Sequence, residues 1–302
     1  MKKIFYLQVF VFFLCFFFVS CANTNYIEKN YSKNILLLKN SKPYISSTEH
    51  TINKQYLVDQ ERASQIREYF KENTELDLDI IAASQKSTWE KAVEIAVFVA
   101  KNIPHDNQKE WLDERNAITL WEYSKRVQTG FNCRWHATLL SELLLSIGIR
   151  NSFVTCLPYD KEDGDCHVVN IVWLPELNKW AMLDCDMLEF ITDSDGTPLS
   201  LQEMREFIQK DKTFTINVLP GFEKSWVGNK SGKKYLQAYW AKNLYWFALF
   251  TVYSFDLEGI HNSDGTTPYQ KYYTCLIPPD YDCSDSFTSE SITSDDQAFW
   301  SY

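Results

Sequence analysis

Three pieces of sequence decide the fold: GFNCRWHATLLSELLLSIGI at residues 130–149, DCHVVNIVW at residues 165–173 and KWAMLDCD at residues 179–186. The first piece has the pattern of a helix that begins at Cys133 and ends at Gly148, with leucines along one side. The other two pieces are apolar and short, which is typical of buried strands. Together they predict a cysteine at the start of a helix, a histidine on a strand and an aspartate at the end of the next strand.

Cys133 stands where an irregular stretch containing Gly130 and Asn132 ends and the predicted helix begins. The partial positive charge at the start of a helix favours the thiolate form of a nearby cysteine, which is its reactive form. This placement makes Cys133 a candidate nucleophile. The alternative is a buried structural cysteine, because cysteine is among the residue types most often found inside proteins.

His167 and Asp184 lie on two strands that the sequence predicts to form an antiparallel hairpin. A turn centred between Pro175 and Glu176 would place His167 directly opposite Asp184, on the same face of the sheet. The carboxylate could then accept a hydrogen bond from one ring nitrogen while the other nitrogen faces Cys133. The alternative is a buried His–Asp pair that serves structure alone.

The same register places Cys166 opposite Cys185 on the other face of the hairpin. These two residues could form a cross-strand disulfide, but we expect reduced thiols because adjacent strands rarely suit disulfide geometry. Cys275 and Cys283 are close enough in sequence for a disulfide across a loop. Cys133 is therefore the cysteine with a reason to be reactive.

The segment from residue 130 to about residue 205 resembles the core of the transglutaminase-like superfamily, which has a papain-like fold. The resemblance rests on a Gly-containing entry to a helix at Cys133, on His167 in a strand, and on a W-x-x-x-D pattern that ends at Asp184. It implies that Cys133 is the nucleophile, His167 the base and Asp184 the residue that orients the base. The sequence departs from the family pattern at three places: one extra residue between Gly and Cys, Cys185 where proline is frequent, and an unusual RWH after the Cys.

Helical patterns precede the strand patterns along the chain, which predicts an α+β fold. In this fold the catalytic Cys lies at the N-terminus of a helix packed on an antiparallel sheet that carries His and Asp. The predicted organisation is a signal peptide at 1–20, a tether at 21–50, an N-terminal helical part at 51–129, the transglutaminase-like core at 130–210, an aromatic-rich α/β extension at 211–281 and an acidic, loosely ordered tail at 282–302.

The N-terminus has the pattern of a bacterial lipoprotein signal. A basic start is followed by an almost wholly apolar run to Val19, and Ser20 and Cys21 come directly after it. We expect Cys21 to become the first mature residue and to carry a lipid such as palmitate, which would anchor the protein to a membrane of the bacterial cell envelope. The alternative is an ordinary secretory signal with an incidental cysteine. The next best apolar run, residues 244–255, is too short to span a membrane.

The net charge and the possible metal ligands of the chain indicate which partners and cofactors it can bind. The chain has 30 Lys and Arg against 40 Asp and Glu, a formal charge of −10, which argues against nucleic acid. Cys133 and His136 form a C-x-x-H, and Cys166 with His167 adds two potential zinc ligands. Adjacent strand residues point to opposite faces, however, so we expect no metal and no other cofactor. The remaining histidines, at positions 50, 105 and 261, are expected to be surface or packing residues.

These observations predict an acyl-transfer enzyme that acts on peptide or protein amides. Water as acceptor would make it a peptidase or amidase, and an amine would make it a crosslinking enzyme. Hydrolysis is favoured because water and peptide are abundant in the cell envelope. The alternative is a non-catalytic lipoprotein of the same fold that binds peptides or glycans through the aromatic residues between Tyr239 and Tyr253. The sequence makes no prediction of oligomeric state.

Overall fold

The structure is a computed structural model that describes residues 28–47, 51–108, 112, 114–258, 273–282 and 292–301. Its helices are α2 (Tyr31–Asn40), α3 (Gln60–Asn73), α4 (Leu78–Ala83), α5 (Thr88–Asn102), α6 (Ala117–Arg126), α7 (Cys133–Ser146), α8 (Leu201–Gln209), the 3₁₀-helix η1 (Trp226–Gly228), α9 (Lys230–Asn243) and α10 (Asp296–Trp300). Its strands are β1 (Gln55–Tyr56), β2 (Asn151–Leu157), β3 (His167–Leu174), β4 (Lys179–Asp184), β5 (Glu189–Thr192), β6 (Thr215–Val218), β7 (Trp246–Phe250), β8 (Val252–Tyr253), β9 (Tyr273–Leu276) and β10 (Ile292–Thr293).

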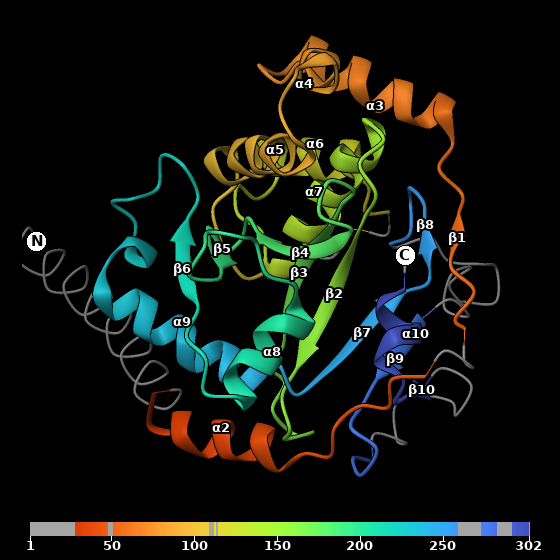
Figure 1. Cartoon of the computed structure of the whole chain (residues 1–302). Coiled ribbons are helices and arrows are strands. Elements are labelled where there is room, and N and C mark those ends of the chain that lie inside the picture. Colours follow the sequence, from red (N-terminus) through yellow and green to blue (C-terminus); the bar gives the residue numbers. More distant parts are fainter. Residues whose placement is uncertain are drawn as a thin grey trace, which may run out of the picture.

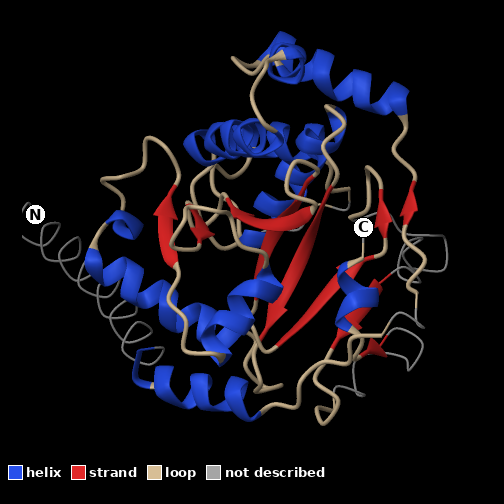
Figure 2. Ribbon diagram, viewed as in Figure 1, coloured by secondary structure: helices blue, strands red, loops and turns tan. Residues whose placement is uncertain are grey.

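An eight-stranded sheet organises the described part of the chain, with the strand order β10-β9-β7-β2-β3-β4-β5-β6. Its pairs are antiparallel except β10 with β9. The helices α3 to α7 precede the sheet strands in sequence and lie above them in Figure 1, while α8 and α9 lie below. Figure 2 shows the same separation of helices from the central strands. The predicted α+β fold is therefore confirmed.

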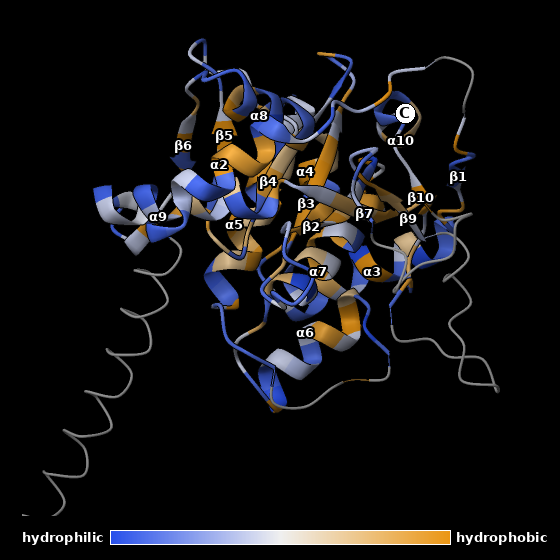
Figure 3. Cartoon of the chain, turned by 90° about the horizontal axis from the view of Figure 1, so that it is seen from below, coloured by the Kyte–Doolittle hydropathy of each residue, from blue (hydrophilic) through white to orange (hydrophobic). Residues whose placement is uncertain are grey.

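Helices pack on both faces of the central strands. On one face, the Asn170 side chain of β3 donates a hydrogen bond to the Ala137 carbonyl of α7 at 2.9 Å. On the other face, the His167 ring contacts α9, and the Trp180 indole of β4 donates to a carbonyl of α10 at 2.8 Å. Both faces of β3 are buried, which explains its nearly continuous apolar sequence. Figure 3 shows this concentration of apolar residues on the central strands.

The hairpin of β3 and β4 has a register two residues away from the predicted one. Asn170 pairs with Leu183, so His167 and Asp184 are diagonal neighbours and do not stand directly opposite each other. The cause is the turn over residues 175–178, whose last residue, an asparagine, has a φ of 51°. Asparagine tolerates this left-handed conformation, which moves the centre of the turn along the chain. A shift of two residues leaves each side chain on its own face, so the prediction of a shared face is correct.

Two predicted flexible segments are partly folded. Residues 31–40 of the expected tether form α2, which packs on α8 and α9 and buries Leu38 completely. Residues 292–301 of the expected tail add β10 to the sheet and form α10, where Phe299 is fully buried. In both segments a few large apolar side chains outweigh the polar composition on which the predictions depended.

Several predicted features lie outside the described residues, namely the signal peptide, Cys21, His50, His261 and Cys283. Within the described ranges, the helices are all too short or too polar to cross a membrane.

Candidate active site

Cys133 is the first residue of α7, as predicted. Asn132 caps the helix with a β-region backbone conformation, and its side-chain oxygen accepts a hydrogen bond from the Trp135 amide at 3.0 Å. The first amides of a helix have no acceptor within the helix, so the N-terminus presents donors and a partial positive charge beside the thiol. Cys133 is partly exposed, which leaves its sulfur within reach of a substrate.

The segment before Cys133 is held by the chain between α5 and α6. Phe131 pairs with this segment through two backbone hydrogen bonds, from its amide to the Pro104 carbonyl at 2.9 Å and from the Asp106 amide to its own carbonyl at 2.8 Å. Gly130 is required at this contact, because a Cβ atom there would lie 2.5 Å from the Cβ of Asp106. The Gln108 side chain accepts from the amide of the residue before Cys133 at 2.7 Å. These contacts fix the approach to the thiol.

His167 and Asp184 form a buried pair. His167 is the first residue of β3 and Asp184 the last residue of β4, and each is 1% exposed. The Nε2 atom of His167 lies 2.6 Å from Oδ2 of Asp184. The other carboxylate oxygen of Asp184 accepts from the amides of Asp186 and Met187, at 2.9 and 3.0 Å. Asp184 is therefore oriented from both sides, which fixes the imidazole that it holds.

The structure brings Cys133 together with this pair. Burial opposes protonation of the His167 ring, but the Asp184 carboxylate and a side-chain hydrogen bond with Cys133 raise the pKa of His167 well above its ordinary value. Since Asp184 occupies Nε2, the Nδ1 atom remains for the thiol. The raised pKa favours an imidazolium, which in turn stabilises a thiolate. The three residues thus have the arrangement of a Cys–His–Asp triad.

Three further cysteines lie near the site. Burial raises the pKa of the Cys156, Cys166 and Cys185 thiols. Cys166 and Cys185 are not joined by a disulfide, as predicted, but the observed register does not place them directly opposite each other. Cys283 lies outside the described residues, so its pairing with Cys275 stays a prediction.

A second histidine–carboxylate cluster beside the triad was missed by sequence reasoning. Asp186 is buried between two histidines, with its Oδ1 atom 2.9 Å from Nδ1 of His105 and 2.8 Å from Nδ1 of His136. His105, which was expected to be a surface or packing residue, is half-exposed and also pairs with Asp186. Burial opposes charge on Asp186, but the bonds from both histidines lower the pKa of its carboxyl. The sequence signal was Asp186 itself, two residues after Asp184.

The His136 side chain is buried in the interior, so it does not form a metal site with the Cys133 thiol. Its Nε2 atom lies 2.9 Å from the Ile103 carbonyl, and its Nδ1 atom faces Asp186. Trp135 beside it is fully buried, and Arg134 forms an ion pair with Glu258. In the unusual RWH sequence, Trp135 and His136 are therefore buried, and Arg134 forms an ion pair. Among the described residues, no His, Cys, Asp and Glu side chains cluster so that they could hold a metal ion.

Comparison with known proteins identifies the domain. Residues 74–185 match the family model described as the transglutaminase-like superfamily, so this part of the chain is a transglutaminase-like domain. The match includes Cys133, His167 and Asp184. It also begins well before residue 130 and ends at residue 185, so it includes α4, α5 and α6 together with residues 130–185 of the predicted core.

One solved structure is described as "a Putative Cysteine Protease from Cytophaga hutchinsonii". It is similar at 11% identity with a TM-score of 0.28, over 56% of this chain and 51% of that chain. The alignment therefore spans about half the length of that protein. A search of the curated proteins finds no match. At the level of the superfamily, the domain supports a cysteine-dependent enzyme.

Proposed function

We propose that the protein is a cysteine-dependent acyl-transfer enzyme that hydrolyses peptide or protein amides. The observation that carries the proposal is the position of His167, hydrogen-bonded to Asp184 through Nε2 and to Cys133. An imidazole held in this way can keep the thiol ionised and then move its proton. Asp184 itself, which accepts from two backbone amides as well, keeps the ring in one orientation.

The reaction would proceed in two steps. The Cys133 thiolate attacks the amide carbonyl carbon, and the oxygen takes up negative charge next to the backbone N–H of Cys133 at the start of α7. The imidazolium of His167 gives its proton to the leaving amine, so that a thioester remains. His167 then takes a proton from water as the water attacks the thioester, which releases the acid and restores the thiol. An amine in place of water would give a crosslinked product.

The test is mass spectrometry of peptide libraries after incubation with the enzyme, with and without an added amine. Cleavage or deamidation supports hydrolysis, and an amine adduct supports crosslinking. Cys133→Ser should abolish turnover and thiol labelling. Cys166→Ser is the matched control, because Cys166 is also partly exposed and lies beside His167 in the sequence but is not part of the triad. Full turnover in C133S would contradict the proposal.

We further propose that the enzyme is anchored to a membrane of the cell envelope through a lipid on Cys21. The apolar run that ends just before Cys21 supports this location. A clickable palmitate analogue should label the wild-type protein, and Cys21→Ala should abolish the label and release the protein from the membrane fraction. Labelling that persists in C21A would contradict lipidation at this residue.

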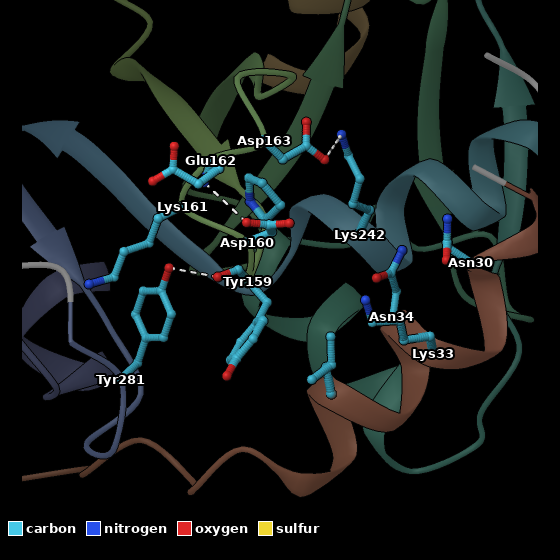
Figure 4. Close-up of a pocket in the computed structure, with 12 residues that line it drawn as sticks. Asn30, Lys33, Asn34, Tyr159, Asp160, Lys161, Glu162, Asp163, Lys242 and Tyr281 are labelled. Carbon is cyan, nitrogen blue, oxygen red and sulfur yellow. Dashed lines mark hydrogen bonds and ion pairs between the residues drawn. The ribbon is translucent and has the colours of Figure 1, made fainter. Parts of the chain in front are cut away.

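A pocket favours the second candidate function, a non-catalytic protein that binds peptides or glycans. The aromatic residues between Tyr239 and Tyr253, through which this binding was expected, are mostly buried and do not line the pocket. The pocket has a volume of about 470 Å³ and lies between α2 and the loop of residues 158–163 (Figure 4). Its wall combines Asn34, the exposed ring of Tyr159 and Lys242, which is paired with Asp163 at 3.1 Å. Six of the twelve lining residues are charged, with both signs present: Lys33, Asp160, Lys161, Glu162, Asp163 and Lys242. Together with the amides and the exposed aromatic ring, they suit a polar peptide or glycan ligand.

The reactivity of Cys133 separates the two functions. An activated thiol should react quickly with iodoacetamide at neutral pH, whereas a binding protein has no need of one. Slow labelling of Cys133, equal to that of Cys166, would favour the binding function. Tyr159→Ala and Asn34→Ala should then weaken ligand binding without any effect on labelling.

A further inference from the structure

The imidazole of His167 lies against two successive aromatic residues of α9. The rings of Tyr239 and Trp240 meet it edge-on, with centroid distances of 5.4 and 5.6 Å. His167 is 1% exposed, Tyr239 3% and Trp240 0%. Helix α9 comes after residue 185, so both rings lie outside the region that matches the transglutaminase-like family.

Both aromatic side chains are anchored by a carboxyl group. The indole N–H of Trp240 donates to Oε1 of Glu189 at 2.8 Å. The hydroxyl of Tyr239 donates to Oδ1 of Asp165 at 3.2 Å, two residues before His167. A buried indole or phenol needs such a partner, and the partner also fixes the rotation of the ring. The two anchors therefore determine the plane that each ring presents to His167.

Glu189 has the setting of a neutral carboxylic acid. It is fully buried and pairs directly across the sheet with Asp184. Burial and the negative charge of Asp184 raise the pKa of Glu189 well above its ordinary value, against smaller opposing effects of Trp240, His167 and Lys233. Its Oε2 atom has no hydrogen-bond partner among the described residues. A carboxylate could not remain in this position without compensation, whereas a neutral acid can still accept from the indole.

We infer that Glu189 and Trp240 are positioning residues for catalysis, and that with Tyr239 they clamp the His167 ring in the orientation that serves both Asp184 and Cys133. The inference rests on the proposed function. The clamp covers the hydrogen bond between His167 and Asp184 on the α9 side and keeps water from it, which strengthens that bond. It also gives the chain beyond residue 185 a part in the active site, since α9 and β5 supply the clamp.

The test uses the full-length protein and the rate of alkylation of Cys133 by iodoacetamide at a series of pH values. Glu189→Leu removes the acceptor for the indole, and Trp240→Phe removes the donor but keeps a ring. Each should slow alkylation at neutral pH on the order of tenfold, because a misplaced imidazole stabilises the thiolate less well. Glu189→Gln keeps an uncharged acceptor and should restore most of the rate lost in E189L. Trp121→Phe, at a buried tryptophan of α6 that stacks on Phe98, is the control and should have no effect.

The double variant E189L/W240F shows whether Glu189 affects the alkylation rate through Trp240 or independently of it. If Glu189 acts through Trp240, the double variant should be no slower than W240F alone, whereas independent effects would multiply. Wild-type alkylation rates in folded E189L and W240F would overturn the inference. If E189L does not fold, W240F alone decides the question. Slow alkylation of Cys133 in the wild-type protein would instead contradict the proposed function.

Discussion

Asp184 holds His167 at 2.6 Å between their Oδ2 and Nε2 atoms, although the two residues are diagonal and not direct neighbours in the hairpin. The offset leaves the other oxygen of Asp184 free to accept two backbone amides of the turn that follows β4. These two amides hold the carboxylate in place, and the carboxylate in turn orients the imidazole. The register of the β3–β4 hairpin therefore helps to determine how Asp184 is oriented towards His167.

Asp184→Asn tests this relationship. The variant loses the negative charge that raises the pKa of His167, so that pKa should fall. Turnover needs a protonated His167 for the leaving amine, so the alkaline limb of the activity profile should move to lower pH. The rate at the optimum should fall by about 10²-fold or more.

The measurement is the pH dependence of kcat/KM. Asp195→Asn is the control, because Asp195 is exposed and remote from the imidazole in sequence. An unchanged alkaline limb in D184N would show that Asp184 does not set the protonation of His167.

Gly130→Ala tests the close approach beside the entry to α7. The new Cβ atom would lie 2.5 Å from the Cβ of Asp106 and 3.0 Å from the Pro104 carbonyl oxygen. The backbone must therefore move, which should lower the free energy of unfolding by about 1 to 3 kcal/mol and slow the alkylation of Cys133. Urea denaturation measures the first effect. Gly164→Ala is the matched control, since no atom lies within 4 Å of its added Cβ; equal effects of the two variants would refute the steric argument.

The sequence was sufficient to predict the triad because each member has a local signal. Cys133 follows a helix-capping asparagine, and His167 and Asp184 bound two adjacent strands. Side chains alternate between the two faces of a strand, so a shift of two residues in the register leaves each residue on the same face. The prediction that His167 and Asp184 share a face therefore did not depend on the exact register. The exact register depended on the conformation of one asparagine at residue 178, which the sequence allows but does not dictate.

The pairings in the clusters around the triad have no such local signal, although Asp186 itself stands two residues after Asp184. The contact between Trp240 and Glu189 joins residues 51 positions apart, and that between His105 and Asp186 joins residues 81 positions apart. Neither pair belongs to one periodic segment, so only the tertiary fold brings its members together. Secondary structure can be inferred from periodicity, whereas such contacts require the packing of one element on another.

Asp186→Asn tests the second cluster. Asp186 is buried between His105 and His136, so the loss of its charge leaves a buried histidine without its ion-pair partner. We expect the free energy of unfolding to fall by about 3 kcal/mol at mildly acidic pH. The difference from wild type should shrink as the pH rises. The reason is that the pKa of His136 is raised above its unfolded value, so its stabilisation is complete below the unfolded pKa and is lost as the pH rises through the folded pKa.

Urea denaturation at several pH values measures this effect. His105→Ala is the control, because the His105 side chain is 51% exposed and should contribute less than about 1 kcal/mol. A difference between wild type and D186N that grows with pH would contradict the assignment of His136 as the charged partner.

Glu189→Gln tests the neutral state of the buried acid that anchors the clamp. The pKa of Glu189 is raised in the folded protein, so the fold binds this proton more tightly than the unfolded chain does. Its contribution to stability is therefore complete below the unfolded pKa of about 4.3 and is lost as the pH rises towards the folded pKa. Glutamine carries no such proton. The stability of E189Q relative to wild type should increase with pH above that value, by up to about 1.4 kcal/mol for each pH unit.

The charged groups that face Glu189 are Asp184 on β4, His167 on β3 and Lys233 on α9, and E189Q leaves all three in place. Thermal or urea denaturation of both proteins from mildly acidic to mildly alkaline pH gives the comparison. Glu176→Gln, at an exposed carboxylate of the β3–β4 turn, should show no such trend over this range. A constant difference between E189Q and wild type at all pH values would mean that Glu189 is ionised in the fold, and the indole of Trp240 would then be held by a buried charge.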